Sequence, residues 1–212
     1  MILFLDTVSP LPEFSLIKEN KVVKSIQILD KNSNKISECI IPAYLTLQNK
    51  LKTNDKINKL IVCTGPGSFT ALRVGIAFMY GLSVSKNISL IGISCIDLLQ
   101  FAIPKLHEKK TLMIICSSND QNFIAISSNK SDKYLINKID DKIHPTNINY
   151  NQYSYCISNS NLSSNIVEIL GLNICQQINF TELVRLNLND ILSLPTKSII
   201  EPIYISDNKI FD

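Results

Sequence analysis

The chain has 212 residues, of which 45% are hydrophobic, and its 21 Lys and Arg residues give a net charge of +3 against 18 Asp and Glu residues. A chain of this length and composition can bury a substantial core without disulfides, in one large domain or two small ones. The lysines are scattered and do not gather beside aromatic residues, which argues against direct binding of RNA or DNA.

The apolar runs, cysteines and histidines bear on location and metal binding. The apolar residues 2–5 end at Asp6 without the pattern of a signal peptide, and no apolar run approaches the length of a membrane span. We therefore expect a cytoplasmic protein that makes no membrane contact. His107 and His144 lie far apart in sequence and are expected at the surface, with no metal site. Six cysteines without a C-x-x-C pair are expected to be free, mostly buried thiols: Cys39, Cys63, Cys95, Cys116, Cys156 and Cys175.

The first half of the chain has the pattern of a mixed sheet with helices. Short apolar runs predict strands over 2–5, 14–17, 22–29, 60–63 and 89–93. Apolar residues at helical spacing predict helices over 36–51, 69–85 and 96–103, the last opened by Ser94 and Asp97 as a capping box. A meander of three strands followed by alternating helices and strands favours a mixed sheet covered by helices.

The second half echoes this pattern less regularly. Strands are predicted over 111–116, 122–127, 133–136 and 153–157, helices over 164–170 and 181–188, and an extended tail over 201–205. Residues 137–152 are rich in asparagine and weakly patterned. We place a domain boundary near 104–110, which divides the chain into an N-terminal subdomain of residues 1–104 and a smaller, divergent C-terminal subdomain of residues 105–212.

A glycine-rich turn joins the strand at 60–63 to the helix at 69–85. Three of the six glycines lie in the segment Gly-Pro-Gly-Ser-Phe-Thr-Ala-Leu-Arg-Val-Gly at 65–75. Gly65 and Gly67 can take positive φ, Ser68 or Thr70 can cap the helix, and the first-turn N–H groups make a candidate anion site. The segment is neither a Walker loop nor a dinucleotide fingerprint. Taken alone, it fits a tight strand-to-helix connection as well as a phosphate-binding turn.

Four segments together resemble one family. The first strand ends in Asp6 and Thr7, the glycine-rich segment spans 65–75, Ile-Gly-Ile-Ser lies at 91–94, and Glu-Pro-x-Tyr lies at 201–204. These segments are similar to those of the TsaB (YeaZ) family. The resemblance implies an α/β ASKHA (actin-like ATPase/ribonuclease H-like) fold, with two subdomains that each hold a mixed sheet flanked by helices.

The resemblance also implies a role. Members of the TsaB family are non-catalytic partners of the paralogue TsaD in threonylcarbamoylation of adenosine 37 (t6A) in tRNAs that read codons beginning with A, and TsaE joins the complex. ATP and metal are then expected on the partner subunits, with no cofactor of this chain's own. The chain lacks the His-x-x-x-His metal pair of TsaD-like enzymes. It is expected to touch tRNA only through the complex, and a homodimer is an alternative when the chain is alone.

Two sets of residues carry the expected sites. Helices 36–51 and 69–85 are expected to pack side by side and to present a surface to TsaD. Glycines at 75 and 81 would permit close approach of the two backbones. A bulky residue at position 75 should then weaken the complex but leave the fold intact. Arg73 would either contact a partner carboxylate or project into solvent. The alternative is that these helices only cover their own sheet. The expected interface comprises Tyr44, Phe69, Arg73, Gly75, Ala77 and Gly81.

The second set is a possible vestigial nucleotide or phosphate site: Asp6, Thr7, Gly65, Gly67, Ser68 and Thr70. A lone Asp cannot close a magnesium site, so a structural strand-end turn is the competing interpretation of Asp6. The alternative function is a free-standing ASKHA-type, ATP-dependent phosphotransferase that uses these residues around phosphate. A protease is disfavoured because neither histidine lies in a motif with a nucleophile.

Overall fold

The structure is a computed structural model. It describes residues 1–29, 35–52, 55–103, 111–118, 121–127, 134–139, 149–153, 155–171, 175–195, 199–205 and 209–211. The expected boundary at 104–110, His107, His144 and most of 137–152 lie outside these residues.

The first sheet has five strands in the order β3-β2-β1-β4-β5. The strands β1 (Ile2–Asp6), β2 (Glu13–Lys18) and β3 (Lys21–Gln27) form the predicted antiparallel meander. The strands β4 (Lys59–Cys63) and β5 (Leu90–Ile93) add to β1 in parallel. Every residue of β1 is buried, because this central strand is covered on both faces.

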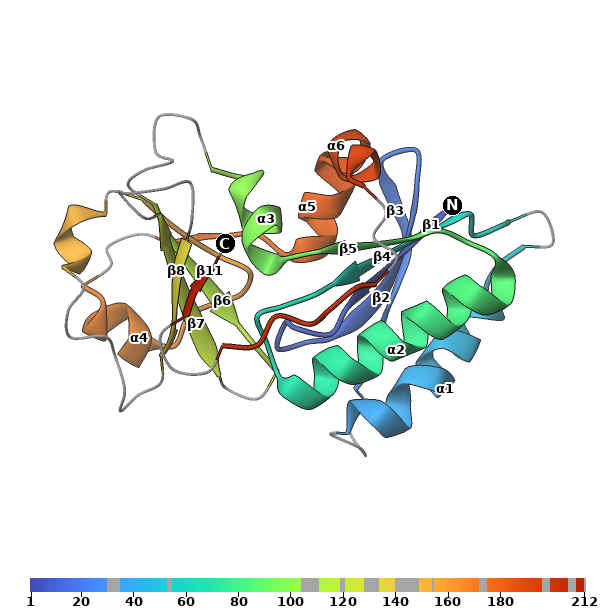
Figure 1. Cartoon of the computed structure of the whole chain (residues 1–212), viewed down its shortest axis with the longest axis horizontal. Helices are drawn as coiled ribbons and strands as arrows, with labels where there is room; N and C mark the ends of the chain where they lie inside the picture. Colours follow the sequence, from blue (N-terminus) through green and yellow to red (C-terminus); the bar gives the residue numbers. More distant parts are fainter. Residues whose placement is uncertain are drawn as a thin grey trace.

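Helices α1 (Ile36–Gln48) and α2 (Phe69–Lys86) lie side by side on one face of this sheet (Figure 1). Their inward residues enclose a core in which the rings of Phe14, Tyr44 and Phe78 pack with centroids 5.2 to 5.9 Å apart. Both helices were predicted from their apolar spacing, and both are confirmed. Burial of these inward stripes drives the helices onto the sheet.

The second sheet has six strands in the order β10-β9-β6-β7-β8-β11. They are β6 (Thr111–Cys116), β7 (Asn122–Ser127), β8 (Tyr134–Ile139), β9 (Tyr155–Ser158), β10 (Gln176–Gln177) and β11 (Lys209–Phe211). Strand β6 is antiparallel to β7 and parallel to β9, as β1 is to β2 and β4. Helix α4 (Ser164–Ile169) packs on this sheet, and a short 3-10 helix covers Tyr150–Gln152. The two sheets therefore repeat one strand order, with β11 added at an edge.

Helices α3 (Cys95–Gln100), α5 (Phe180–Leu186) and α6 (Leu188–Ser193) lie on the other face of the first sheet. One continuous core there joins residues of both halves, including Phe4, Ile61, Met113, Phe123 and Phe180. The two halves are therefore held together by shared apolar burial.

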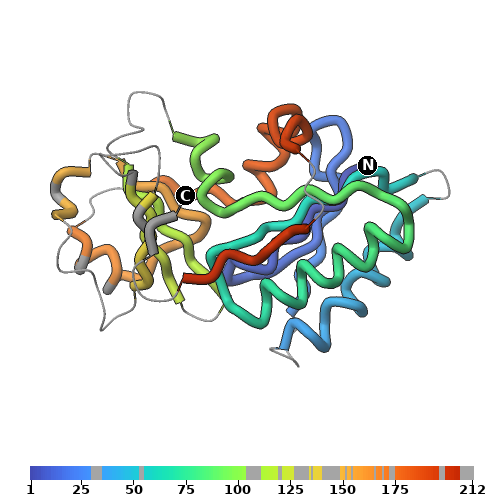
Figure 2. The backbone as a smooth tube through the Cα atoms, viewed as in Figure 1, coloured from blue at the N-terminus to red at the C-terminus, as the bar shows by residue number. Residues whose placement is uncertain are grey.

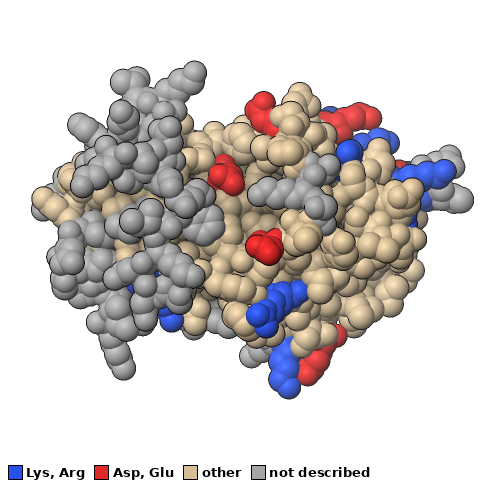
Figure 3. All heavy atoms as spheres, in the orientation of Figure 1, with Lys and Arg blue, Asp and Glu red and all other residues tan. Residues whose placement is uncertain are grey.

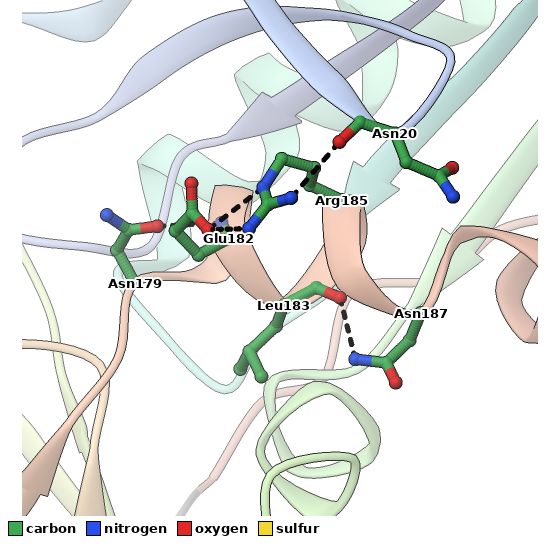
Figure 4. Close-up of polar contacts among 6 residues, drawn as sticks. All are labelled: Asn20, Asn179, Glu182, Leu183, Arg185 and Asn187. Atoms are coloured by element: carbon green, nitrogen blue, oxygen red, sulfur yellow. Dashed lines mark hydrogen bonds and ion pairs between the residues drawn. The ribbon is translucent and has the colours of Figure 1, made fainter.

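Polar contacts attach α5, which follows the second sheet in sequence, to the first sheet. Glu182 holds the guanidinium of Arg185 at 2.6 and 2.9 Å, and Arg185 Nη1 donates to the carbonyl of Asn20 in the β2–β3 turn at 3.1 Å (Figure 4). Asn179 caps the helix by accepting from the N–H of Glu182 at 2.7 Å. Residues 180–193 thus pack on elements of the first half, although they lie in the second half of the sequence.

Several details of the sequence interpretation change. The predicted helix 181–188 is two helices that meet at Asn187, and β10, β11 and α6 were not predicted. The cap of α3 is confirmed, because the N–H of Asp97 donates to Ser94 Oγ at 3.0 Å. All six cysteines are free; Cys175 is half-buried and the other five are buried. Across the described ranges, no helix combines the length and apolar character that crossing a membrane requires.

Candidate interaction site around helix α2

The glycine turn between β4 and α2 is tightly enclosed. Gly65 has φ +106°, which favours glycine, and a Cβ there would lie 2.9 Å from Leu72 Cδ1 and 3.0 Å from the carbonyl of Ile203. The carbonyl of Gly65 accepts from the N–H of Cys95, at the start of α3, at 2.8 Å. Ser68 occupies the N-cap position of α2, but its side chain makes no capping bond to the described helix. Backbone contacts and close packing therefore contribute to the shape of the turn.

Asp6 holds the turn that follows β1. Its Oδ1 accepts from the N–H of Val8 at 2.8 Å and from the N–H of Ser9 at 3.1 Å. Burial raises the pKa of the Asp6 carboxyl to about 6, although the hydrogen bonds from Ser9 and Val8 act in the opposite direction. This geometry favours the strand-end role of Asp6, because one carboxylate oxygen is already committed to the backbone.

Asn159, which follows β9, joins the turns of the two halves. Its Oδ1 accepts from the N–H of Cys116 at 2.7 Å, and its Nδ2 donates to the carbonyl of Cys116 at 3.0 Å and to Ser9 Oγ at 2.9 Å. Nearby, the N–H of Ser118 donates to the carbonyl of Val8 at 2.9 Å. The sequence analysis did not identify Asn159, which lies two residues beyond the predicted strand 153–157.

Thr7 lies against the middle of α2. Its side chain is fully buried, and its Oγ1 has no hydrogen-bond partner among the described residues. A Cβ on Gly75 would lie 2.6 Å from Thr7 Cγ2 and 2.9 Å from Thr7 Oγ1. Gly75 therefore lies at a close contact inside this chain, and we now expect a bulky residue there to disturb the fold as well as any partner contact.

The opposite side of α2 is exposed and largely apolar. The exposed fractions are 51% for Phe69, 48% for Tyr80 and 68% for Val84. Arg73 and Ala77 are also exposed and continue the same stripe at helical spacing. On the neighbouring helix α1, Ile41 and Leu45 are exposed by 56% and 51%. We call Phe69, Arg73, Ala77, Tyr80 and Val84 the outer face of α2.

Arg73 is held by two aromatic rings. Its guanidinium carbon lies 3.8 Å from the ring centroid of Phe69 and 5.5 Å from that of Tyr204, and its Nε donates to Tyr204 Oη at 2.8 Å. The two rings have centroids 4.6 Å apart. Arg73 is thus on the surface but already oriented, which reduces the side-chain entropy lost on binding.

The remaining residues expected at an interface lie in different environments. Tyr44 is only 5% exposed and belongs to the core under α1, so its expected position on a partner surface is wrong. Gly81 faces open space, since no described atom lies within 4 Å of the position that a Cβ would take. It therefore makes no close helix contact within the described chain.

The expected phosphate-site residues do gather at one end of the first sheet, where the turns after β1 and β4 meet the start of α2. Gly67 is close to Val8, because an added Cβ would lie 3.1 Å from Val8 Cγ2. Within the described ranges, no group of three or more His, Cys, Asp or Glu residues is arranged to hold a metal ion.

The repeated sheets and their covering helices define the class of protein, an ASKHA-type α/β protein, as expected. Two solved structures share this fold, one described as an uncharacterized protein with similarity to peptidase YEAZ and the other as YeaZ, both from Pseudomonas aeruginosa. The first is 12% identical with a TM-score of 0.60 and covers 97% of this chain and 99% of that one. The second is 13% identical with a TM-score of 0.60 and covers 96% and 99%.

Sequence comparison identifies the family. The TsaD family model, described as tRNA N6-adenosine threonylcarbamoyltransferase, matches residues 30–184. The tRNA threonylcarbamoyladenosine biosynthesis protein TsaB of Buchnera aphidicola subsp. Schizaphis graminum (strain Sg) is 26% identical over 141 residues, which cover 61% of this chain and 62% of that relative's length. The chain belongs to the TsaD family and, within it, to the TsaB/YeaZ group.

Proposed function

We propose that this chain is a non-catalytic subunit required for t6A formation at adenosine 37 of tRNAs that read codons beginning with A. It acts by binding and supporting a TsaD-type enzyme, with TsaE joining the complex. Family membership supports the pathway, and the outer face of α2 is the observation that supports a partner role. ATP and metal belong to the partner subunits, and tRNA contacts are made through the complex in the cytoplasm.

The outer face of α2 has the composition of an interface. Aromatic and arginine residues dominate binding energy at protein–protein contacts, and charged residues are depleted at the interface core. Phe69, Arg73 and Tyr80 lie on one continuous helical stripe, and Figure 3 shows few charged side chains over the face that carries α2. An apolar helix face with few charges suits a partner helix packed alongside it.

The geometry near Asp6 supports a non-catalytic role. The Asp6 carboxylate accepts from two backbone N–H groups, and the turn that carries it is tied to the second half through Asn159 and Ser118. A phosphotransferase of this fold would need these turns to accept phosphate. Here they bond to one another, so the alternative of a free-standing ATP-dependent enzyme has less support.

The first experiment is an omission assay. Threonylcarbamoylation is reconstituted from TsaC, TsaD and TsaE proteins with and without this chain, and modified adenosine is quantified. We expect modification only when the chain is present. Equal modification without it would remove the proposal, and ATP turnover by the isolated chain would then favour the phosphotransferase.

A pair of surface variants tests the interface. Tyr80→Lys places a charge on the outer face of α2, and Leu186→Lys places one at an exposed apolar position on α5. Both should leave stability nearly unchanged, since surface substitutions usually shift it by within about 0.5 kcal/mol. We expect Tyr80→Lys to raise the Kd for the TsaD-type partner by at least about 10-fold, as loss of an aromatic anchor does. Equal effects of the two variants would place the partner elsewhere.

The same variants apply to self-association. When the partner is absent, a second copy of this chain can use the same apolar face, because a helix face packs on itself around a twofold axis. Sedimentation of the isolated chain should then show a dimer that Tyr80→Lys weakens and Leu186→Lys leaves unchanged. A dimer that resists Tyr80→Lys would use another surface.

A further inference from the structure

Residues 199–205, which we call the tail, cross from the second half of the chain and pack beside α2 (Figure 2). The N–H of Ile203 donates to the carbonyl of Thr64, next to the glycine turn, at 2.8 Å. Beyond the tail, β11 pairs with β8 in the second sheet. The tail thus lies on the first subdomain while its continuation belongs to the second.

Two glycines of the first half make room for the tail. A Cβ on Gly92, in β5, would lie 2.7 Å from Ile200 Cγ2, and one on Gly65 would lie 3.0 Å from the carbonyl of Ile203. Residues 91–94 and 65–75 carried the family resemblance in the sequence analysis. Both glycines therefore lie against residues 199–205, and a side chain at either position would collide with them.

The docked tail shapes the outer face of α2. Tyr204 contacts both Phe69 and Arg73, so the orientation of the Arg73 guanidinium depends on the tail. A groove of about 650 Å³ separates the tail from the helix. Arg73, Ala77 and Tyr80 line it from the helix, and Ile199, Glu201 and Tyr204 line it from the tail.

The docked tail is only partly buried. Ile199 is 69% exposed, and among the described residues the tail is hydrogen-bonded to the first subdomain by one backbone bond, from Ile203 to Thr64, and by the side-chain bond from Arg73 to Tyr204. A segment held in this way can open locally at low free energy. A partner that contacts the groove would bind the docked state better than the open state, and would shift the population toward docking.

We propose that the tail is part of the partner surface, and that tail docking and partner binding strengthen each other. This inference rests on the proposed function and adds a coupling to it. The groove has one wall on α2 and the other on the tail. Contacts with both walls require residues 199–205 to be in place, and the coupling is reciprocal by linkage.

Two variants of the full chain undock the tail by different routes. Gly92→Val inserts a side chain where Ile200 lies, and Ile203→Pro removes the N–H that bonds Thr64 without changing the helix or sheet. Leu186→Lys is the control, because it changes an exposed residue on α5 that belongs neither to the tail nor to the outer face of α2. Hydrogen exchange reports docking of residues 199–205, exchange in β1 and β4 reports the fold, and titration with the TsaD-type protein gives Kd.

We expect the partner to slow exchange in the tail of the wild-type chain. Both undocking variants should speed tail exchange, leave β1 and β4 protected and raise Kd by about 10-fold, within the usual range of coupling between sites. Leu186→Lys should change neither tail exchange nor Kd. If Gly92→Val also speeds exchange in β4, that variant has disturbed the fold, and the Kd of Ile203→Pro is the test of the coupling.

Two outcomes would overturn the inference, and they are distinguishable. Fast tail exchange with an unchanged Kd would show that the partner ignores the tail, while the proposed function would stand. Failure of the wild-type chain to bind the TsaD-type protein would overturn the proposed function and the coupling together.

Discussion

The two halves of this protein share a strand order but differ in what covers it. In the first half, helices of 13 and 18 residues lie on one face of the sheet. In the second half, the helix after the equivalent strand β9 has six residues. A long helix can bury one stripe and still present a broad outer face, whereas six residues make fewer than two turns. The helical part of the partner surface that we propose therefore belongs to the first half.

The halves also differ in how the turn after their first strand is held. After β1, Asp6 supplies its own carboxylate to the N–H groups of Val8 and Ser9. At the end of β6, Cys116 has no such carboxylate, and its backbone N–H and carbonyl are both bonded by Asn159, which follows the neighbouring strand β9. One fold thus accepts different side chains, provided that the buried backbone groups are paired.

The largest expected effect is a loss of stability when the close contact between α2 and Thr7, in the first half, is disrupted. Gly75→Leu should lower the free energy of unfolding by about 3 kcal/mol, because overpacking a close contact forces the backbone to move. Gly81→Leu, on the exposed side of the same helix, should be neutral or slightly stabilising. Urea denaturation of both variants provides the measurement. Equal stability of the two variants would contradict the internal role of Gly75.

The next effect concerns Asp6. Its pKa of about 6 in the folded chain exceeds the usual 3.8, because the carboxyl is buried. The folded chain therefore holds this proton more tightly, and the contribution of Asp6 to stability is greatest below about pH 4 and falls by about 3 kcal/mol as pH rises through 6. Asp6→Asn keeps an acceptor for both N–H groups but cannot ionise.

Urea denaturation of the wild type and Asp6→Asn at pH 4 and pH 7.5 tests this shift. The variant should gain stability relative to the wild type as pH increases. A constant difference between the two proteins at both pH values would mean that Asp6 titrates normally in the folded chain.

The smallest expected effect follows from removing Asn159, which joins the turns that follow β1 and β6. Asn159→Ala should lower the free energy of unfolding by about 2 kcal/mol, because it leaves the buried N–H of Cys116 without its acceptor. Asn179→Ala removes an exposed helix cap and should be less costly, at about 1 kcal/mol. Chemical denaturation compares them. An Asn159→Ala variant as stable as Asn179→Ala would show that water replaces the lost bonds.

Local pattern was sufficient for the main elements of this fold. The apolar runs predicted β1, β4 and β6, and the helical spacing predicted α1 and α2, because burial of one stripe or of a whole strand leaves a direct trace in sequence. The two-residue strand β10 and the edge strand β11 left no such trace, since Gln176, Gln177 and the end of the chain carry no apolar alternation.

The sequence by itself determined the mixed sheet, the glycine turn and the family, because these depend on neighbouring residues and on local backbone conformation. Only the tertiary structure decided which residues face the core. Tyr44 and Gly75 were expected outside and lie inside, while the tail and Asn159 contact residues more than 40 positions away. Such contacts are set by how the layers stack, and a periodic pattern carries no information about a partner so distant in the chain.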